Sequence, residues 1–269
     1  MSLEVVSGVR SKLAEGPRFY DGVLTWVDIE GCALHRFDGT HSVERFDVML
    51  GCANPTSDGD IVLALADRIE LLSSGEVLSR FPHGPELRAN DGACDPTGRL
   101  WVGTTALDHR FGAGALYRLD EPDLTTILDG LTIANGIGWS PDGLSMYYVD
   151  TPTEQVDVYP YDGELGARAT FAEVDGHPDG LAVDDEGFVW IAFYGGSRIE
   201  RRAPDGSLDR VVPTPTPNPT ACCFAGTTLY ITSGRGDGLV YAYDAGVSGP
   251  QATPFRRTAP SDAEPTSAR

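Results

Sequence analysis

Short runs of apolar and aromatic residues recur along this chain, and each run begins just after a glycine. Within the runs, apolar residues alternate with polar ones or form brief unbroken stretches, and they do not recur at the 3.6-residue period of a helix. Val23-Leu-Thr-Trp-Val27 and Phe188-Val-Trp-Ile-Ala192 are typical, because they are rich in the β-branched and aromatic residues that strands favour. The pattern predicts an all-β protein with almost no helix.

The glycines that precede these runs are regularly spaced. In Ser140-Pro141-Asp142-Gly143 the glycine closes a sequence that is typical of a tight hairpin turn. Aligned at that position, the equivalent glycines follow one another at intervals of 37, 39, 45, 44 and 39 residues. They are Gly22, Gly59, Gly98, Gly143, Gly187 and Gly226. Six units of about 40 residues, each holding several strands, predict a six-bladed β-propeller.

The two ends of the chain are expected to meet in this ring, because a closed ring leaves no sheet edge exposed. Leu3-Glu-Val-Val6 is the predicted closing strand of the last blade. We expect residues 1–259 to form a single propeller domain. The tail, residues 260–269, has no apolar pattern and is expected to be disordered.

One position of the repeat carries candidate chemistry. It lies seven or eight residues before each turn glycine, where the innermost strand of each blade is expected to begin. Its occupants are Glu15, Gly51, Asn90, Asn135, Asp179 and Asn218. Because innermost strands line the central channel of a propeller, these side chains are predicted to converge. A glycine directly follows Glu15, Asn135 and Asp179, and glycine lets the backbone approach a ligand closely.

This ring of residues would bring together two carboxylates and up to three amide oxygens. Carboxylates that meet in a narrow channel repel each other unless a proton or a cation lies between them. Oxygen ligands suit a hard divalent cation, and the ring lacks the histidine of typical zinc sites. We expect one divalent cation, with Ca²⁺ foremost and Mg²⁺, Mn²⁺, Zn²⁺ or Fe²⁺ as alternatives. In the alternative interpretation, these residues only cap strands and turns.

Composition limits the classes of partner and the compartment. The net charge of −20, with Lys12 as the only lysine, disfavours binding to nucleic acid or to an anionic membrane. No stretch approaches the ~18 apolar residues of a membrane span, and no signal peptide is visible. Five cysteines without a CxxC pair argue against a disulfide framework and a thiolate zinc site. We therefore expect a cytoplasmic monomer or weak homo-oligomer that acts on a small molecule.

Four motifs in order resemble those of the SMP-30/gluconolactonase/regucalcin-like (LRE) family. They are Glu15-Gly-Pro17, Arg88-Ala-Asn-Asp-Gly92, the stretch from Ala134 to Gly143, and Pro178-Asp-Gly-Leu-Ala-Val-Asp184. The similarity covers roughly residues 8–255 and implies a six-bladed propeller with one divalent metal near the channel mouth. It also implies hydrolysis of sugar lactones and related esters.

Carried over motif by motif, the resemblance assigns roles to single residues. Glu15, Asn135 and Asp179 would be the direct metal ligands, and Arg88 and Asn90 would contact the substrate. Asp179 could also accept a proton from the attacking water as general base. In some relatives a glutamate in the loop after the third repeat's second strand contacts the sugar, but the corresponding residues 105–112 contain none. His109 in that loop is a candidate substrate contact.

Several alternatives stay open at this level. Arg88 could instead be an exposed arginine paired with Glu86, and Asp91 and Asp95 are interpreted as turn formers. The predicted function is a metal-dependent lactonase of the gluconolactonase type. Its rivals are a propeller that binds metal or a small ligand without turnover, and a biosynthetic-pathway hydrolase that acts on another lactone or ester.

Overall fold

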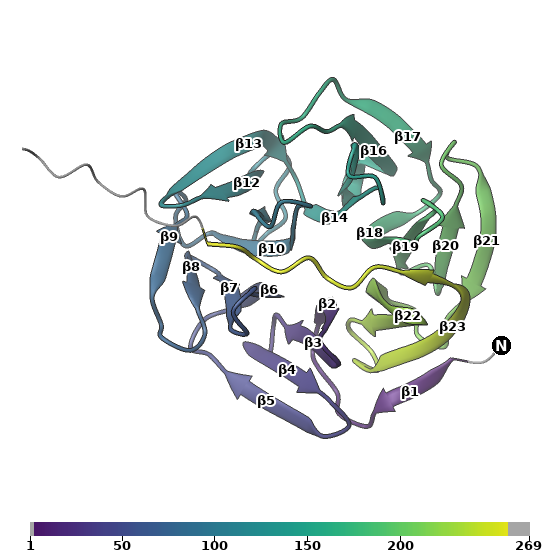
Figure 1. Ribbon diagram of the computed structural model, residues 1–269, viewed down its shortest axis with the longest axis horizontal. Coiled ribbons are helices and arrows are strands. Elements are labelled where there is room, and N and C mark those ends of the chain that lie inside the picture. Colours follow the sequence, from purple (N-terminus) through teal and green to yellow (C-terminus); the bar gives the residue numbers. More distant parts are fainter. Residues whose placement is uncertain (1–2, 258–269) are drawn as a thin grey trace, which may run out of the picture.

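Six antiparallel sheets radiate around a central channel in the computed structural model, which describes residues 3–257 (Figure 1). This confirms the prediction of an all-β, six-bladed propeller. The described residues contain a single short 3₁₀ turn, η1 (Thr151–Thr153), and no helix in this part of the chain is long and apolar enough to cross a bilayer. The tail predicted over 260–269 lies outside the described residues.

The blades follow one another in sequence order. The first contains β2 (Ala14–Tyr20), β3 (Val23–Asp28), β4 (Ala33–Phe37) and β5 (His41–Arg45), and the second contains β6 (Leu50–Pro55), β7 (Ile61–Leu65), β8 (Arg68–Leu71) and β9 (Val77–Arg80). The third contains β10 (Leu87–Cys94), β11 (Leu100–Ala106), β12 (Gly114–Asp120) and β13 (Asp123–Leu131), and the fourth contains β14 (Ala134–Trp139), β15 (Ser145–Asp150), β16 (Gln155–Pro160) and β17 (Ala169–Glu173). The fifth contains β18 (His177–Val183), β19 (Val189–Tyr194), β20 (Arg198–Arg202) and β21 (Leu208–Pro213), and the sixth contains β22 (Pro219–Ser233), β23 (Val240–Gly249) and β1 (Glu4–Ser7).

Apolar side chains fill the spaces between neighbouring blades. The second strand of each blade is almost wholly buried, and Val62 of β7 packs in one cluster with Leu100 of β11 from the next blade. The innermost strands β2, β6, β10, β14, β18 and β22 pack against one another around the channel. Because both faces of each sheet are covered, the strands show short apolar runs as well as alternation.

Both chain ends complete the sixth blade. β22 folds back on itself at Gly226 (φ +58°), where the Thr220 and Thr232 hydroxyl oxygens lie 2.8 Å apart across the hairpin. β1 then pairs antiparallel with β23, with Val5 opposite Tyr241. The closing strand expected from the sequence is therefore present, one residue later than its predicted bounds.

Residues 250–257, which we call the C-terminal strap, cross one face of the ring after β23 (Figure 1). The backbone N–H of Ala252 donates to the Phe19 carbonyl of blade 1, and that of Phe255 donates to the Pro55 carbonyl of blade 2. The Phe255 side chain is 1% exposed and lies in the apolar cluster between blades 2 and 3. The strap thus ties the last blade to its neighbour, blade 1, and to blades 2 and 3 farther around the ring.

A pair of histidines in blade 1 predicts a pH-dependent stability. His35 stacks on Trp26 with ring centroids 5.0 Å apart, and its Nδ1 lies 2.9 Å from Nε2 of His41. Burial and the neighbouring His41 lower the pKa of His35 to about 4, whereas Asp28 opposes and Arg45 adds to this shift. Between pH 6.5 and 4 the unfolded chain therefore binds a proton that the folded chain does not.

We expect stability to fall as the pH falls through this window, and His35→Gln to remove up to about 1.4 kcal/mol per pH unit of that slope. Urea unfolding of both proteins at about pH 7, 6, 5 and 4 measures the slopes. Parallel stability curves for the two proteins would contradict this assignment.

Candidate metal and substrate site

The innermost strands leave their regular pairing at the candidate position of the repeat. The pairing with the second strand shifts between Glu15 and Arg18 in β2, between Ala89 and Gly92 in β10, between Ala134 and Ile137 in β14, and between Pro178 and Leu181 in β18. Bulges of this kind re-aim a side chain. They explain how strands that otherwise serve as apolar core present polar residues to the channel.

The glycines next to these residues are required by close approach of the strands. A β-carbon on Gly136 would lie 2.5 Å from the Asp179 carbonyl oxygen, and one on Gly180 would lie 2.3 Å from the Ala221 β-carbon. Such distances are too short for any side chain. The glycines therefore allow the innermost strands to come together around the axis.

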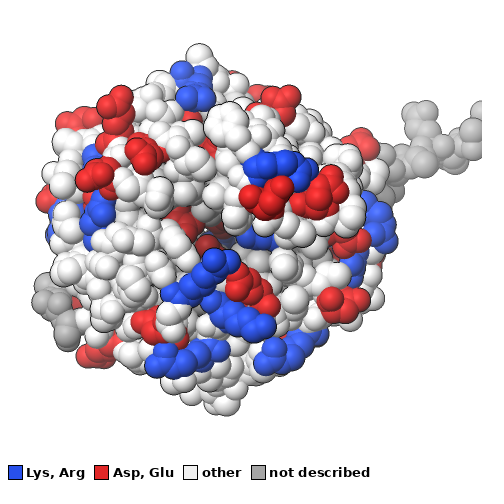
Figure 2. Space-filling model, turned by 180° about the vertical axis from the view of Figure 1, so that it is seen from behind, with Lys and Arg blue, Asp and Glu red and all other residues white. Residues whose placement is uncertain are grey.

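The six residues to which the resemblance or the loop assigned a role line one cavity of about 390 Å³: Glu15, Arg88, Asn90, His109, Asn135 and Asp179. Asn218, which was expected to converge with them, does not line this cavity, and its Nδ2 donates to the Arg235 carbonyl instead. The cavity lies at the end of the channel opposite the C-terminal strap. Figure 2 shows this face, with acidic side chains at the bottom of a central hollow and basic side chains beside it. The structure thus brings together residues from blades 1, 3, 4 and 5.

Hydrogen bonds fix the amide side chains at the cavity floor. Asn135 Nδ2 donates to Thr151 Oγ1 at 3.0 Å, and the Thr151 hydroxyl in turn donates to the Pro178 carbonyl at 2.8 Å. Asn90 Nδ2 donates to the Ala134 carbonyl at 2.9 Å. With both amide nitrogens held by oxygen acceptors, the orientation of each side-chain oxygen is determined.

The two carboxylates lack the partners that buried charges normally have. Asp179 Oδ1 is buried and has no hydrogen-bond partner, and Glu15 accepts a 3.2 Å bond from the N–H of Gly16. Among the described residues, no lysine or arginine lies within 4 Å of either carboxylate. Burial raises the pKa of both groups. Asp91 raises the pKa of Glu15 further, and Glu15 and Asp91 together raise that of Asp179 further.

This donor set fits a divalent cation. A positive ion would relieve the repulsion between the carboxylates and satisfy the free Asp179 oxygen. Within residues 3–257 no three His, Cys, Asp or Glu side chains cluster as a metal site, and the set found here is two carboxylates with amide oxygens. Hard cations such as Ca²⁺ accept such mixed oxygen ligands.

Arg88 is directed into the site rather than to the surface. It is 8% exposed, and its Nη1 donates to Asn90 Oδ1 at 2.7 Å and to the Ala89 carbonyl at 2.9 Å. Glu86, its alternative partner in the sequence analysis, lies 3.9 Å from Arg110 instead. In the described part of the chain no carboxylate lies within 4 Å of the Arg88 guanidinium, so the group remains available to a ligand.

His109 lies on the loop that follows β11 and has left-handed backbone geometry, with φ +54°. Its Nδ1 lies 3.4 Å from Thr105 Oγ1. Burial, with Arg88 and Arg235 nearby, lowers the pKa of His109, so its ring is neutral at pH 7. A neutral imidazole can donate or accept one hydrogen bond at the mouth of the cavity.

The interpretation of Asp91 as a turn former was wrong. Asp91 lies within β10, is 7% exposed, and forms a 3.4 Å ion pair with Arg18. Arg18 Nε also donates to Asn54 Oδ1 at 3.1 Å. The sequence signal was present, since Asp91 directly follows a channel residue on a strand.

Asp95 does form a turn, because its Oδ1 accepts the backbone N–H groups of Thr97 and Arg99.

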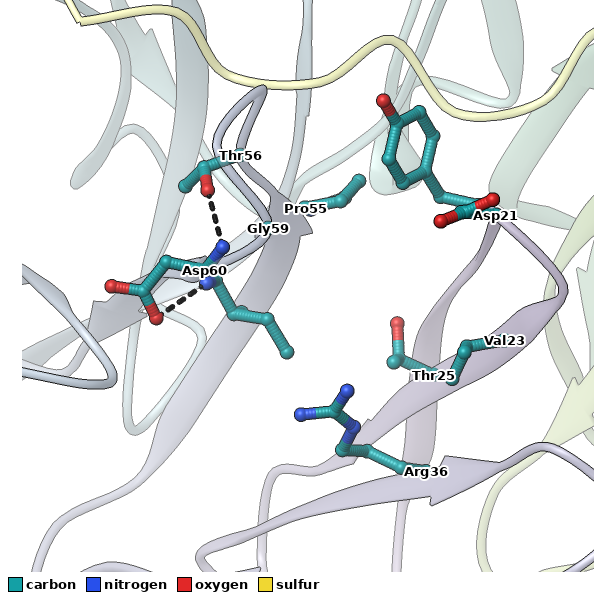
Figure 3. A pocket seen from close by; sticks show the side chains of 10 residues that line it. Asp21, Val23, Thr25, Arg36, Pro55, Thr56, Gly59 and Asp60 are labelled. Carbon is teal, nitrogen blue, oxygen red and sulfur yellow. Dashed lines mark hydrogen bonds between the residues drawn. The ribbon is translucent and has the colours of Figure 1, made fainter.

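A smaller cavity of about 130 Å³ between blades 1 and 2 contains none of the predicted residues. Figure 3 shows its lining, which includes Arg36 and Thr25 on one side and Thr56 and Asp60 on the other. Thr56 Oγ1 accepts the Asp60 N–H at 2.8 Å. The hydrogen bond that joins Thr56 to Asp60 is formed within one turn, whereas hydrogen bonds at the channel site also join different blades.

The fold and the channel site together define a six-bladed propeller with a ring of oxygen donors on its axis. The chain belongs to the SMP-30/gluconolactonase/LRE-like family, whose model matches residues 13–235.

Similar proteins include enzymes that act on lactones. The chain is 38% identical over 253 residues to an L-arabinolactonase of Azospirillum brasilense, covering 86% of this chain and 84% of that protein. It is 37% identical over 231 residues to a 6-deoxy-6-sulfogluconolactonase of Pseudomonas putida, covering 79% of each. A solved regucalcin of Agrobacterium tumefaciens, described as a calcium-binding protein, superposes with a TM-score of 0.89 at 27% identity and covers 94% of this chain and 97% of that one.

Proposed function

We propose that this protein is a divalent-metal-dependent lactonase, with Glu15, Asn135 and Asp179 as the metal ligands. The observation that carries the proposal is the unpartnered Asp179 Oδ1 beside Glu15 in a buried cavity, where none of the described lysine or arginine side chains lies within 4 Å of either carboxylate. The relatives named as lactonases support the reaction class. The similarity to a calcium-binding regucalcin supports Ca²⁺ as the first candidate, with Mg²⁺, Mn²⁺, Zn²⁺ and Fe²⁺ as alternatives.

The side chains of the site divide the work of ester hydrolysis. When bound, a divalent cation polarises a carbonyl and lowers the pKa of water. Asp179 can accept the proton of the attacking water as the new bond to the carbonyl carbon forms. Breaking of the ring C–O bond then leaves an alkoxide, to which Asp179 can return the proton. The product is a hydroxy acid.

Arg88 and Asn90 orient the substrate in this proposal. The Arg88 guanidinium has donors that its two hydrogen bonds leave free, and it is held in place by Asn90 Oδ1. A fixed donor beside the carboxylates suits an ester carbonyl or a hydroxyl oxygen. His109 supplies a further polar contact from the loop at the mouth.

Hydrolysis of a lactone releases acid, so a pH-indicator assay tests the proposal directly. We expect the chelator-treated protein to be inactive towards aldonolactones and simple lactones, and one of the five divalent cations to restore turnover. The same cation at about 100 times its dissociation constant should raise the Tm by about 5 °C. Binding of one cation without acid release from any lactone would favour a propeller that captures its ligand without turnover.

A further inference from the structure

A second layer of side chains lies directly above the ring of oxygen donors. It consists of the residues two positions before the ring residues, which lie within or just before successive innermost strands. In extended backbone, residues two positions apart point to the same side. In blade order those that line the cavity are Leu13, Met49, Arg88, Ile133 and His177. Any substrate with its carbonyl at the ring must lie against this layer.

The layer is apolar over blades 1, 2 and 4. Leu13, Met49 and Ile133 are half-buried, and Leu13 and Met49 also pack against the apolar core between blades 1 and 2. Below Met49 the ring position is Gly51, where a β-carbon would lie 2.5 Å from the Ala89 carbonyl carbon. Blade 2 therefore offers the cavity no polar side chain at either level.

The mouth of the cavity continues this apolar wall. Leu107, on the loop after β11, lines the cavity and is 50% exposed. Its position is fixed because its backbone N–H donates to the Glu86 carbonyl at 2.8 Å. Pro152 lines the cavity from blade 4. We call Leu13, Met49, Leu107, Ile133 and Pro152 the apolar wall.

The polar groups at the same height lie elsewhere or are already paired. Arg88 and His177 belong to blades 3 and 5, and Nδ1 of His109 lies 3.4 Å from Thr105 Oγ1 on the loop after β11. Glu30, which lines the cavity from blade 1, forms a 2.7 Å ion pair with Arg235. A hydroxyl that faces the apolar wall would lose its water and gain no partner, whereas a methyl or methylene group would be buried there. The wall therefore discriminates against hydroxyls on one side of the substrate.

We infer that this pocket selects lactones that carry alkyl or deoxy carbon on the side facing the apolar wall, in preference to fully hydroxylated aldonolactones. This inference rests on the proposed lactonase function and specifies its substrate class. Arg88 and the ring hold the ester group, and the apolar wall sets the preference among lactones of equal size.

Three γ-lactones with the same ring and the same number of carbons test the preference: arabinono-γ-lactone, 2-deoxyribono-γ-lactone and γ-valerolactone. We expect kcat/KM to rise in that order, by about 10-fold or more between the first and the last. Met49→Gln and Leu107→Asn place polar groups of similar size in the wall. Each should reduce the ratio of kcat/KM for γ-valerolactone to kcat/KM for arabinono-γ-lactone about 10-fold. Leu208→Asn is the control, because Leu208 is 51% exposed on the outermost strand of blade 5.

The inference would be overturned if the wild type preferred arabinono-γ-lactone, or if both wall variants kept the same ratio of kcat/KM values as the control. Either result would leave the proposed lactonase function standing. If no lactone is hydrolysed, the proposed function fails. The corresponding lactams, which resist hydrolysis, then decide the class that the pocket binds. A larger Tm rise with γ-valerolactam than with its hydroxylated analogues supports the apolar wall as the determinant, and the reverse order contradicts it.

Discussion

Asp179→Asn is expected to lower kcat/KM for the best lactone by about 10³-fold, the largest loss of any single substitution in the site. The variant keeps the shape of the side chain but removes the charge and the proton acceptor from the buried group whose Oδ1 has no partner in the protein. The variant should also lose the rise in Tm that the activating cation gives to the wild type. Initial rates by the pH-indicator assay and thermal melts with and without the cation measure both effects.

Asp244→Asn is the matched control for this experiment. Asp244 is exposed on β23, and its Oδ1 accepts the N–H of Gly246 at 3.1 Å, a bond that asparagine also makes. The control should retain wild-type rates and the cation-dependent Tm. Should Asp179→Asn turn over lactone like the control, Asp179 would be neither ligand nor base.

Phe255→Ala should lower the free energy of unfolding by about 3–5 kcal/mol, which corresponds to a Tm lower by about 10 °C. Phe255 is 1% exposed between blades 2 and 3, and its backbone bonds to Pro55 and Ser57 hold the C-terminal strap across the ring. Removing its ring leaves a cavity and releases the strap. Urea unfolding and thermal melts measure the loss.

The strap also covers the end of the channel opposite the candidate site. Cys222 and Cys223 line the cavity of about 310 Å³ beneath Pro250 and Gln251. Thiol labelling of these cysteines should therefore be faster in Phe255→Ala than in the wild type. Leu208→Ala, a truncation at an exposed position, is the control for both measurements. A Tm within about 2 °C of the wild type would show that Phe255 does not anchor the strap.

Much of the candidate site was predictable because it repeats. A polar residue at one offset from a turn glycine, found in several units, points to Glu15, Asn90, Asn135, Asp179 and Asn218 in the amino-acid sequence, and the family resemblance then implies that Glu15, Asn135 and Asp179 are the metal ligands. Asp91 was not predicted, because its place next to Asn90 resembles an Asn-Asp-Gly turn. The bulge after Ala89 shows why it differs: the strand continues, and Asp91 pairs with Arg18 across the channel.

Arg88 illustrates a choice that the sequence left open. In sequence, Glu86 is two positions away, and an exposed pair was as reasonable as a buried contact. Packing of the innermost strands decides between them, because Arg88 is buried and its donors reach Asn90 and Ala89. The strap carried no signal at all, since Pro250-Gln-Ala-Thr253 has neither apolar period nor turn pattern.

The sequence by itself determined the repeating unit, the number of blades and the polar position within each unit. These follow from local hairpins and their turns, whose signals lie within about 40 residues of chain. Only the tertiary structure decided which of these side chains share a cavity, which carboxylate oxygen is left without a partner, and where the apolar wall lies. Such properties depend on ring closure, which brings Glu15 and Asp179 from distant blades to one axis and buries both carboxylates there.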